Sequence, residues 1–225
     1  QRAYRNSLEI PLHTDRSDIV AMLSVRTAKE GGLSTYASVG AVHNLLLETN
    51  PKLLAPLYRG YRMHLFGEEP PGAAPVTADP VPVLSARDGL VSARIVPEYI
   101  DMAEVELGEP LAPLDREAVD TFLQVAASAQ MRFDIMLEPG DLSLINNYAV
   151  LHARTLFDDY PEQERKRYLL RLWLETDDRR QLDEAMFEKG GIDQQPEREN
   201  SYYNGDAARA ANRGRYGEAV GLPEA

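Results

Sequence analysis

Two short segments, far apart in the sequence, carry side chains that together could bind a metal ion. His13 and Asp15 flank Thr14, and His152 ends the segment 146–152. In an extended chain, His13 and Asp15 point to the same side, because side chains alternate along a strand. Two imidazoles and one carboxylate on one face of a metal leave the opposite face open, which is the ligand set of non-heme Fe(II) oxygenases. Our hypothesis is a metal site formed by His13, Asp15 and His152.

The sequence context of His13 and His152 strengthens the evidence for a metal site, which the residue types alone support only weakly. The triplet His-x-Asp arises by chance in many proteins, and a single His near a strand end is more often a surface or hydrogen-bonding residue. The chain holds only four His, and His13 and His152 both end an apolar strand and precede a polar loop. His43 lies in an expected helix, and His64 lies in an extended segment without a nearby carboxylate. We therefore interpret His43 and His64 as structural.

A pair of cations four residues apart indicates a second functional feature. Arg167 and Arg171 lie on one apolar strand, 167–174, and should face the same side. One interpretation is an exposed strand face that pairs with acidic neighbours. The other is a cleft in which a planar guanidinium holds a carboxylate through two hydrogen bonds. A co-substrate with two carboxylates would need one end at the metal and the other end at such an Arg.

Two hydroxyls follow a pair of glycines earlier in the chain. Gly31 and Gly32 precede Ser34 and Thr35, with Leu33 between them. The glycine pair is compatible with a plain hairpin turn. The hydroxyls could equally donate hydrogen bonds to the same carboxylate. The residues alone leave both interpretations open.

The elements that must position these side chains are mostly strands. Apolar or alternating patterns predict strands over 7–15, 19–27, 33–38, 131–137, 142–145, 150–152 and 167–174. The segment 83–95 is expected to form a hairpin with Asp88 and Gly89 at its turn. Helical periodicity predicts helices over 39–49 and 115–130, and a short one from Pro51, with Asn50 and Asp115 as N-caps.

Many strands with a few helices between them predict the architecture. Because strands and helices do not alternate regularly, we expect an antiparallel sandwich or barrel with helices packed outside. A chain of 225 residues suits one domain, and 44% hydrophobic residues can build its core. From about Asp193 the chain is polar, which predicts a loop or a loosely held tail. We therefore divide the chain into a domain, 1–192, and a polar C-terminal extension, 193–225.

Composition excludes several classes of partner and chemistry. The chain has no Cys, which excludes disulfides and thiolate ligands and fits a cytoplasmic location. A net charge of −12 argues against a nucleic-acid partner. No apolar run approaches the roughly 18 residues of a membrane span, and no signal peptide is visible at the start. We expect a small-molecule substrate, and a homo-oligomer is compatible with the sequence.

Four pieces in this order resemble the taurine dioxygenase (TauD/TfdA-like) family of Fe(II)- and 2-oxoglutarate-dependent oxygenases. The pieces are His13-Thr14-Asp15, Gly31-Gly32-Leu33-Ser34, the segment 147–154 and the strand 167–174, and the resemblance runs from about residue 8 to residue 174. Each piece is weak alone, but the combination is specific. The resemblance implies a mainly β fold with flanking helices around a double-stranded β-helix, or jelly-roll, core.

The resemblance also implies the residues that bind the cofactors. His13, Asp15 and His152 would bind Fe(II), and Arg167 would pair with the distal carboxylate of 2-oxoglutarate, the co-substrate used with O2. The family pattern Gly-Gly-x-Thr places Ser34 in the role of a supporting hydroxyl.

Three further residues are candidates for binding. Thr35 is a second hydroxyl beside the co-substrate, although it comes one residue late and would point the other way. Arg171 matches an Arg that faces the primary substrate in several family members. Arg94, on the expected hairpin, is a second candidate for substrate binding.

The implied activity is oxidation, in most cases hydroxylation, of a small organic substrate with release of succinate and CO2. The Arg pair mildly favours an anionic substrate. Asp15 argues against a halogenase, because halogenases of this fold leave that position without a carboxylate. Family members usually carry a substantial portion before His-x-Asp, whereas 12 residues precede His13, so we expect an N-terminal portion to be missing.

Two other functions are compatible with the residues. One is a non-catalytic jelly-roll module that binds a small molecule. The other is a hydrolytic enzyme that uses Zn²⁺ at the same three residues and needs neither O2 nor a 2-oxo acid.

Overall fold

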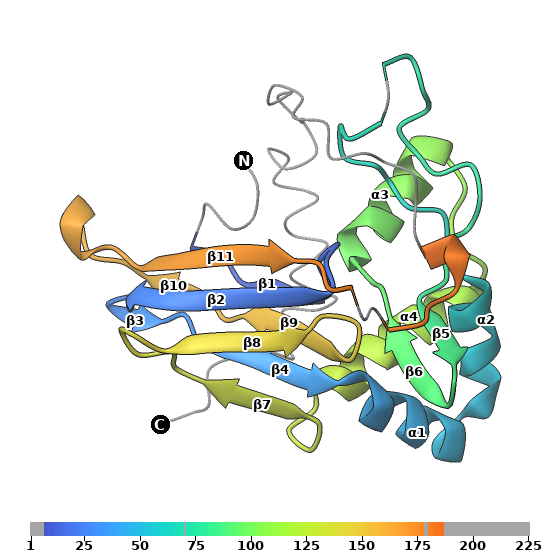
Figure 1. Cartoon of the computed structure of the whole chain (residues 1–225). Helices are drawn as coiled ribbons and strands as arrows, with labels where there is room; N and C mark the ends of the chain where they lie inside the picture. Colours follow the sequence, from blue (N-terminus) through green and yellow to red (C-terminus); the bar gives the residue numbers. More distant parts are fainter. Residues whose placement is uncertain (1–6, 70, 178–179, 187–225) are drawn as a thin grey trace.

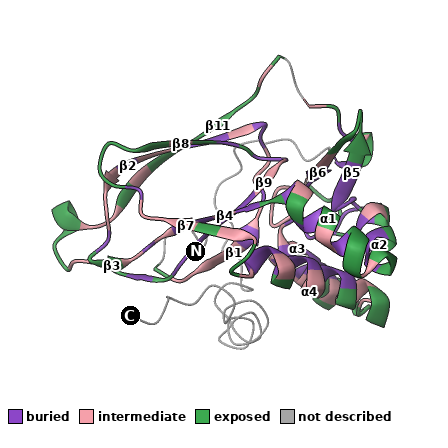
Figure 2. Cartoon of the chain, turned by 90° about the horizontal axis from the view of Figure 1, so that it is seen from below, coloured by how far each residue is buried: buried purple, intermediate pink, exposed green. Residues whose placement is uncertain are grey.

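Two antiparallel sheets lie face to face and form the centre of the molecule (Figure 2). The structure is a computed structural model, and it describes residues 7–69, 71–177 and 180–186. The first sheet has the order β1 (Ile10–His13), β9 (Val150–Arg154), β4 (Ser34–Ser38) and β7 (Arg132–Ile135). The second has the order β11 (Tyr168–Leu174), β2 (Ile19–Arg26) and β8 (Leu142–Asn146).

Two short pairings and a set of helices complete the described fold. β3 (Glu30–Gly31) pairs with β10 (Phe157–Asp158), and β5 (Leu84–Arg87) forms a hairpin with β6 (Leu90–Ala93). The α-helices are α1 (Val39–Thr49), α2 (Leu54–Arg59), α3 (Pro97–Leu107) and α4 (Pro113–Ala127), and they gather at one end of the sheets (Figure 1). Short 3-10 turns are η2 (Pro51–Leu53), η3 (Gln163–Arg165) and η4 (Glu184–Met186). No helix in the described ranges is long and apolar enough to cross a membrane.

The register of the first sheet decides which side chains reach the space between the sheets. His152 pairs directly with His13 on one side and with Tyr36 on the other. Directly paired residues of antiparallel strands project from the same face. The Tyr36 hydroxyl lies 2.8 Å from the hydroxyl of Ser143 on β8, so this face looks toward the second sheet. His13 and His152 therefore point into the sandwich.

The alternate residues of the same strands build the main hydrophobic core. Leu12, Ala37 and Leu151 are almost fully buried and belong to one cluster with residues of α1, α2 and α4. They point away from the second sheet, because they alternate with His13, Tyr36 and His152. The apolar core thus lies between the first sheet and the helices, which leaves the interior of the sandwich free for polar side chains.

The second sheet carries exposed leucines on its outer face. Along β11 the even-numbered residues 170, 172 and 174 point outward, and along β8 residues 142 and 144 do the same. These five leucines are between 40% and 61% exposed. The inward residues of β11 are Leu169, Arg171 and Trp173, so the strand presents leucines on its outer face and the guanidinium of Arg171 on its inner face.

Strand and hairpin positions largely agree with the sequence prediction, whereas one of the two predicted helix caps was wrong. The helix predicted from residue 115 begins at Pro113 with Ala112 as its N-cap, so Asp115 lies in its first turn. Proline is favoured at the first helical position, because the backbone N–H that it lacks would have no partner within the helix there. Pro113 therefore sets the start of α4. Asn50 is the N-cap residue of η2, as predicted, but its side chain makes no capping hydrogen bond. Helix α3 begins at Pro97 and ends at Leu107, with Gly108 in the left-handed conformation as its C-cap, and it was not predicted from the sequence.

Candidate metal centre

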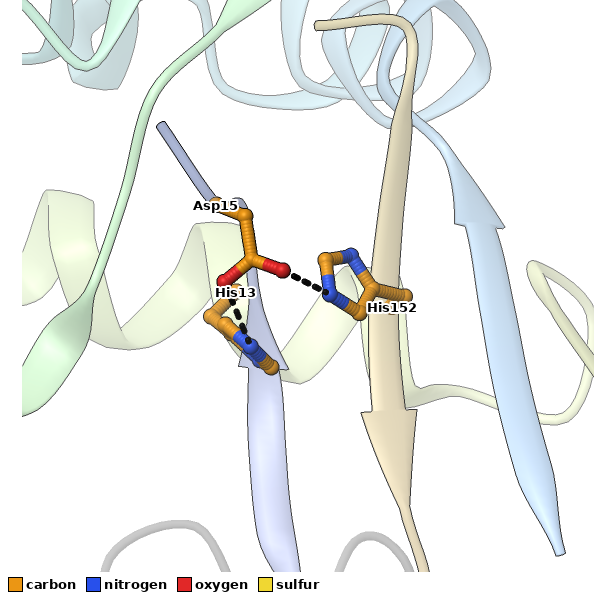
Figure 3. Close-up of side chains that lie close together, drawn as sticks. All are labelled: His13, Asp15 and His152. Atoms are coloured by element: carbon orange, nitrogen blue, oxygen red, sulfur yellow. Dashed lines mark ion pairs between the residues drawn. The ribbon is translucent and has the colours of Figure 1, made fainter. Parts of the chain in front are cut away.

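Three potential metal ligands meet inside the sandwich. Figure 3 shows His13 at the end of β1, Asp15 in the following loop and His152 in the middle of β9. One ligand atom from each lies within 4.8 Å of the other two. Nε2 of His13 is 3.9 Å from Oδ1 of Asp15, and Nε2 of His152 is 3.5 Å from Oδ2. The structure therefore brings together the three residues that the sequence singled out, and their role as ligands is a proposal.

The nitrogen atoms of this site fit a metal ion. Nδ1 of His13 lies 2.8 Å from the carbonyl oxygen of Pro11. A carbonyl only accepts hydrogen bonds, so Nδ1 carries the proton and Nε2 keeps its lone pair toward the site. Both ring nitrogens of His152 are buried and have no hydrogen-bond partner in the described part of the chain. A metal ion at Nε2 would satisfy one of them, and two imidazoles with a carboxylate are a ligand set suited to Fe(II).

Burial and charge set the protonation states that metal binding needs. Burial lowers the pKa of His13 to about 4, assisted by the neighbouring His152 and Arg171. Burial alone would raise the pKa of Asp15, but contact with His152, the neighbouring His13 and the positive charge of Arg171 hold it below its ordinary value. At neutral pH the site therefore presents a neutral His13 imidazole and an ionised carboxylate, the forms that bind metals.

A buried amide clamps the loop that carries Asp15. Oδ1 of Asn147 accepts a hydrogen bond of 2.8 Å from the backbone N–H of Asp15. Nδ2 of Asn147 donates to the carbonyl oxygens of Asp15, at 2.6 Å, and Ser17, at 2.7 Å. Asn147 is fully buried. The sequence analysis gave Asn147 no role of its own, because its distance of 132 residues from Asp15 left no local signal.

The second member of the Arg pair lies beside the triad. Nη1 of Arg171 is 3.2 Å from Oδ2 of Asp15, and Nε1 of Trp173 donates to the same oxygen at 2.9 Å. Arg171, which the sequence suggested as a substrate contact, is thus a neighbour of a candidate metal ligand. Trp173 was not singled out from the sequence, although its position two residues after Arg171 places it on the same face of β11.

Arg167 lies at the start of β11 and packs against the glycine pair. Its guanidinium carbon is 5.3 Å from the centre of the Phe157 ring on β10, and Nη2 is 3.5 Å from the carbonyl oxygen of Gly32. Gly32 has φ of +77°, and a Cβ there would lie 3.0 Å from Nε of Arg167. Glycine is required both by the backbone conformation and by the closeness of this side chain.

A further buried arginine, which the sequence prediction missed, stands near Arg167. Arg154 lies two residues after His152 and therefore shares its inward face. Its guanidinium carbon is 4.8 Å from the centre of the same Phe157 ring. Burial, and secondarily the charge of Arg167, lower the pKa of Arg154 to about 10. Two guanidinium groups packed on one ring create a positive region inside the sandwich.

The two hydroxyls after the glycine pair lie on opposite faces of β4. Ser34 is buried and pairs directly with Arg154, so it faces the interior. Thr35 pairs with Ala153 and Asp134, and its hydroxyl donates to Oδ1 of Asp134 at 2.6 Å. Thr35 thus points away from the candidate metal site, as the period-two alternation of the strand implies, and its suggested role beside the co-substrate stays a prediction.

Arg94 is held by the end of the described chain. It follows β6, is buried, and its guanidinium donates to the carbonyl oxygen of Met186 in η4. Its suggested role in substrate binding stays a prediction. The expected extension 193–225 lies outside the described residues.

Comparisons with known proteins agree with this geometry. The sequence model of the taurine catabolism dioxygenase TauD, TfdA family matches residues 1–173. The chain is 32% identical over 184 residues to "FR-33289 synthase" of Streptomyces rubellomurinus, a match that covers 80% of this chain and 54% of that protein. It is 30% identical over 168 residues to "Taurine hydroxylase-like protein SAT17" of Stachybotrys chartarum, which covers 72% of this chain and 41% of that protein. The chain thus spans about half the length of these relatives.

Solved structures show the same fold. An asparagine oxygenase in complex with Fe(II), 2S,3S-3-hydroxyasparagine and succinate superposes with a TM-score of 0.55 at 23% identity, over 75% of this chain and 50% of that chain. The non-heme iron oxygenase OrfP in complex with Fe superposes with a TM-score of 0.51 at 15% identity, over 76% of this chain and 52% of that chain. These similarities confirm the predicted jelly-roll core. By sequence and by fold, this chain belongs to the TauD, TfdA dioxygenase family.

Proposed function

We propose that this chain is the catalytic core of an Fe(II)- and 2-oxoglutarate-dependent dioxygenase that hydroxylates a small organic substrate and releases succinate and CO2. The observation that carries the proposal is the convergence of one nitrogen from His13, one from His152 and one Asp15 oxygen within 4.8 Å. Two imidazoles and one carboxylate on one side of a metal leave the other coordination positions for the co-substrate and O2. Family membership supports the same activity.

The positive region supports 2-oxoglutarate as the co-substrate. Arg167 at the start of β11 and Arg154 on β9 both approach Phe157, and Ser34 pairs with Arg154 on the interior face. A carboxylate placed there would gain charge-assisted hydrogen bonds from guanidinium groups. Arg167 binds the distal carboxylate in this proposal, and Ser34 supports it with its hydroxyl.

The chain's own residues prepare the reaction by positioning. When bound, Fe(II) with 2-oxoglutarate supplies the oxidising chemistry, and the protein supplies orientation and shielding. His13, Asp15 and His152 hold the metal on one side, and Asn147 fixes the loop of Asp15. The two facing sheets enclose the triad and limit the access of water.

An anionic group on the primary substrate fits the surroundings of the triad. Arg171 presents its guanidinium within 3.2 Å of Asp15, at the side of the candidate metal site. A carboxylate or sulfonate could bind this cation, and a planar guanidinium suits both.

The test measures succinate formation from 2-oxoglutarate in the presence of Fe(II) and O2. We expect the unmodified chain to form succinate, and His13→Ala, Asp15→Ala and His152→Ala each to abolish it, because two remaining ligands do not hold the metal. His43→Ala is the matched control: His43 is also buried, but its Nε2 contacts Tyr58 at 3.0 Å on the helical side of the molecule. Retained succinate formation in all three triad variants would exclude the proposal.

Two other outcomes separate the alternative functions. Metal-independent binding of a small molecule, with no turnover of 2-oxoglutarate, would indicate a non-catalytic binding module. Hydrolytic activity that depends on Zn²⁺ and needs neither O2 nor 2-oxoglutarate would indicate a metallohydrolase. Metal analysis combined with titration of 2-oxoglutarate distinguishes all three.

A further inference from the structure

The two oxygens of Asp15 have different environments. Oδ2 accepts hydrogen bonds from Nε1 of Trp173, at 2.9 Å, and from Nη1 of Arg171, at 3.2 Å, and it also lies 3.5 Å from Nε2 of His152. Oδ1 accepts no hydrogen bond within the described residues and is 3.9 Å from Nε2 of His13. A carboxylate whose one oxygen is held by two donors keeps a fixed orientation and presents its other oxygen.

Both donors come from the sheet opposite the triad. His13, Asp15 and His152 belong to the first sheet and its loop, whereas Arg171 and Trp173 lie on β11 in the second sheet. The pair of hydrogen bonds therefore joins the two sheets across the sandwich at the candidate metal site.

The side chains of Trp173 and Arg171 also contact each other. The guanidinium carbon of Arg171 is 5.0 Å from the centre of the Trp173 ring, a cation–π distance. The Trp173 side chain is not a core residue, because 41% of the residue is exposed. Its short hydrogen bond to Asp15 therefore explains its position better than apolar packing does. Indole is a donor with a single N–H on a rigid ring, which suits it to orient one oxygen atom.

We propose that Trp173 is a positioning residue for the metal: its indole N–H, assisted by Arg171, fixes Oδ2 of Asp15 so that Oδ1 is the single oxygen presented to Fe(II). This inference rests on the proposed function, since it assumes that the triad binds a metal. Partners that orient metal ligands through hydrogen bonds change metal affinity by about 10- to 100-fold when they are removed.

The experiment compares Trp173→Phe with the unmodified chain and with Tyr168→Phe. Trp173→Phe keeps an aromatic ring but removes the donor. Tyr168→Phe is the matched control, because Tyr168 is 46% exposed on the same strand and loses its hydroxyl without touching Asp15. Anaerobic calorimetry measures the affinity for Fe(II), and thermal unfolding without metal measures stability.

We expect Trp173→Phe to weaken Fe(II) binding about 10- to 100-fold. The control Tyr168→Phe should bind Fe(II) with unchanged affinity. The two variants should have similar unfolding temperatures. Equal affinity in both variants would overturn the inference. If the unmodified chain does not bind Fe(II), the proposed function itself fails, so the two failures are distinguishable.

If the Trp173→Phe variant does not fold, a second measurement, made without that variant, tests the inference. Trp173 is the only Trp of the chain, so intrinsic tryptophan fluorescence reports on this site alone. Titration of the unmodified chain with Co²⁺, a paramagnetic ion, should quench that emission to saturation at one equivalent. The same titration of Asp15→Ala should show no saturable quenching. Unchanged emission in the unmodified chain, under conditions where calorimetry detects bound metal, would overturn the inference.

Discussion

At the scale of single residues, neighbouring groups constrain the candidate ligand atoms of two triad members, His13 and Asp15. The carbonyl of Pro11 places the proton of His13 on Nδ1, and Trp173 with Arg171 engages one oxygen of Asp15. These contacts to Asp15 come from a distant segment of the chain. The chemistry therefore depends on a layer of partners around the three ligands, as is usual for metal sites.

Asn147 provides a test of that layer. Asn147→Ala removes one acceptor and two donors, and it leaves backbone groups of Asp15 and Ser17 buried without partners. Each unsatisfied group costs about 1–3 kcal/mol, so we expect a clear loss of unfolding free energy and a weaker affinity for Fe(II). Denaturant unfolding and calorimetry measure the two effects. Asn44→Ala is the control, since Asn44 is exposed on α1. A variant as stable as this control would contradict the clamp.

Glu98, in the first turn of α3, predicts a dependence of stability on pH. Burial, and secondarily the charge of Asp101, raise the pKa of Glu98 from 4.5 to about 7. Between these values the unfolded chain has released the proton and the folded chain retains it, so stability is fully present below pH 4.5 and falls as the pH rises to about 7. Glu98→Gln should therefore raise the unfolding free energy at pH 8 by about 1–3 kcal/mol and have little effect at pH 4. Denaturant unfolding at the two pH values checks this, and a pH-independent difference would refute it.

At the scale of elements, the turn before β4 brings together the residues of the proposed co-substrate site. β3 and β10 pair at Gly31 and Phe157, and the next residue, Gly32, then lies against the side chain of Arg167. The sequence showed the glycine pair and the Arg, but not their contact. It also did not show that Arg154 joins them, because that depends on the register between β4 and β9.

Gly32→Ala tests this arrangement. The new Cβ would lie 3.0 Å from Nε of Arg167, and the backbone at φ +77° disfavours any side chain. We expect weaker binding of 2-oxoglutarate by about tenfold or more, which corresponds to about 1.4 kcal/mol, with little change in affinity for Fe(II). Gly89→Ala is the matched control, because Gly89 has φ of +76° but a Cβ added there would meet no atom within 4 Å. Equal losses of 2-oxoglutarate affinity in both variants would assign the effect to backbone strain alone.

What could be predicted from the sequence followed from local patterns. The alternation of β4, β9 and β11 predicted strands and showed that Thr35 points away from Ser34. The wrong or missing predictions concern either two residues that compete for one structural position or contacts between residues far apart in the sequence. Pro113 outcompetes Asp115 for the start of α4. The clamp by Asn147 and the contact of Trp173 with Asp15 join residues 132 and 158 positions apart, which no local pattern encodes.

At the scale of the whole molecule, the residues of the apolar core and the residues of the candidate metal site lie in different layers of the fold. The apolar core lies between the first sheet and the helices, and the triad lies between the two sheets. Polar and charged side chains can then occupy the interior of the sandwich without displacing core packing. The sheet opposite the triad contributes Arg171 and Trp173, so the candidate metal site is complete only when both sheets are in place.

In the proposed function, the triad and the positive region together bind one metal ion and one 2-oxoglutarate. An anaerobic calorimetric titration with 2-oxoglutarate, with and without Fe(II), measures this directly for the unmodified chain, His152→Ala and Arg167→Met. We predict tight binding only in the unmodified chain with Fe(II), and weak or absent binding in the other cases. Binding of 2-oxoglutarate with the same affinity in the absence of Fe(II), or in His152→Ala, would contradict the account.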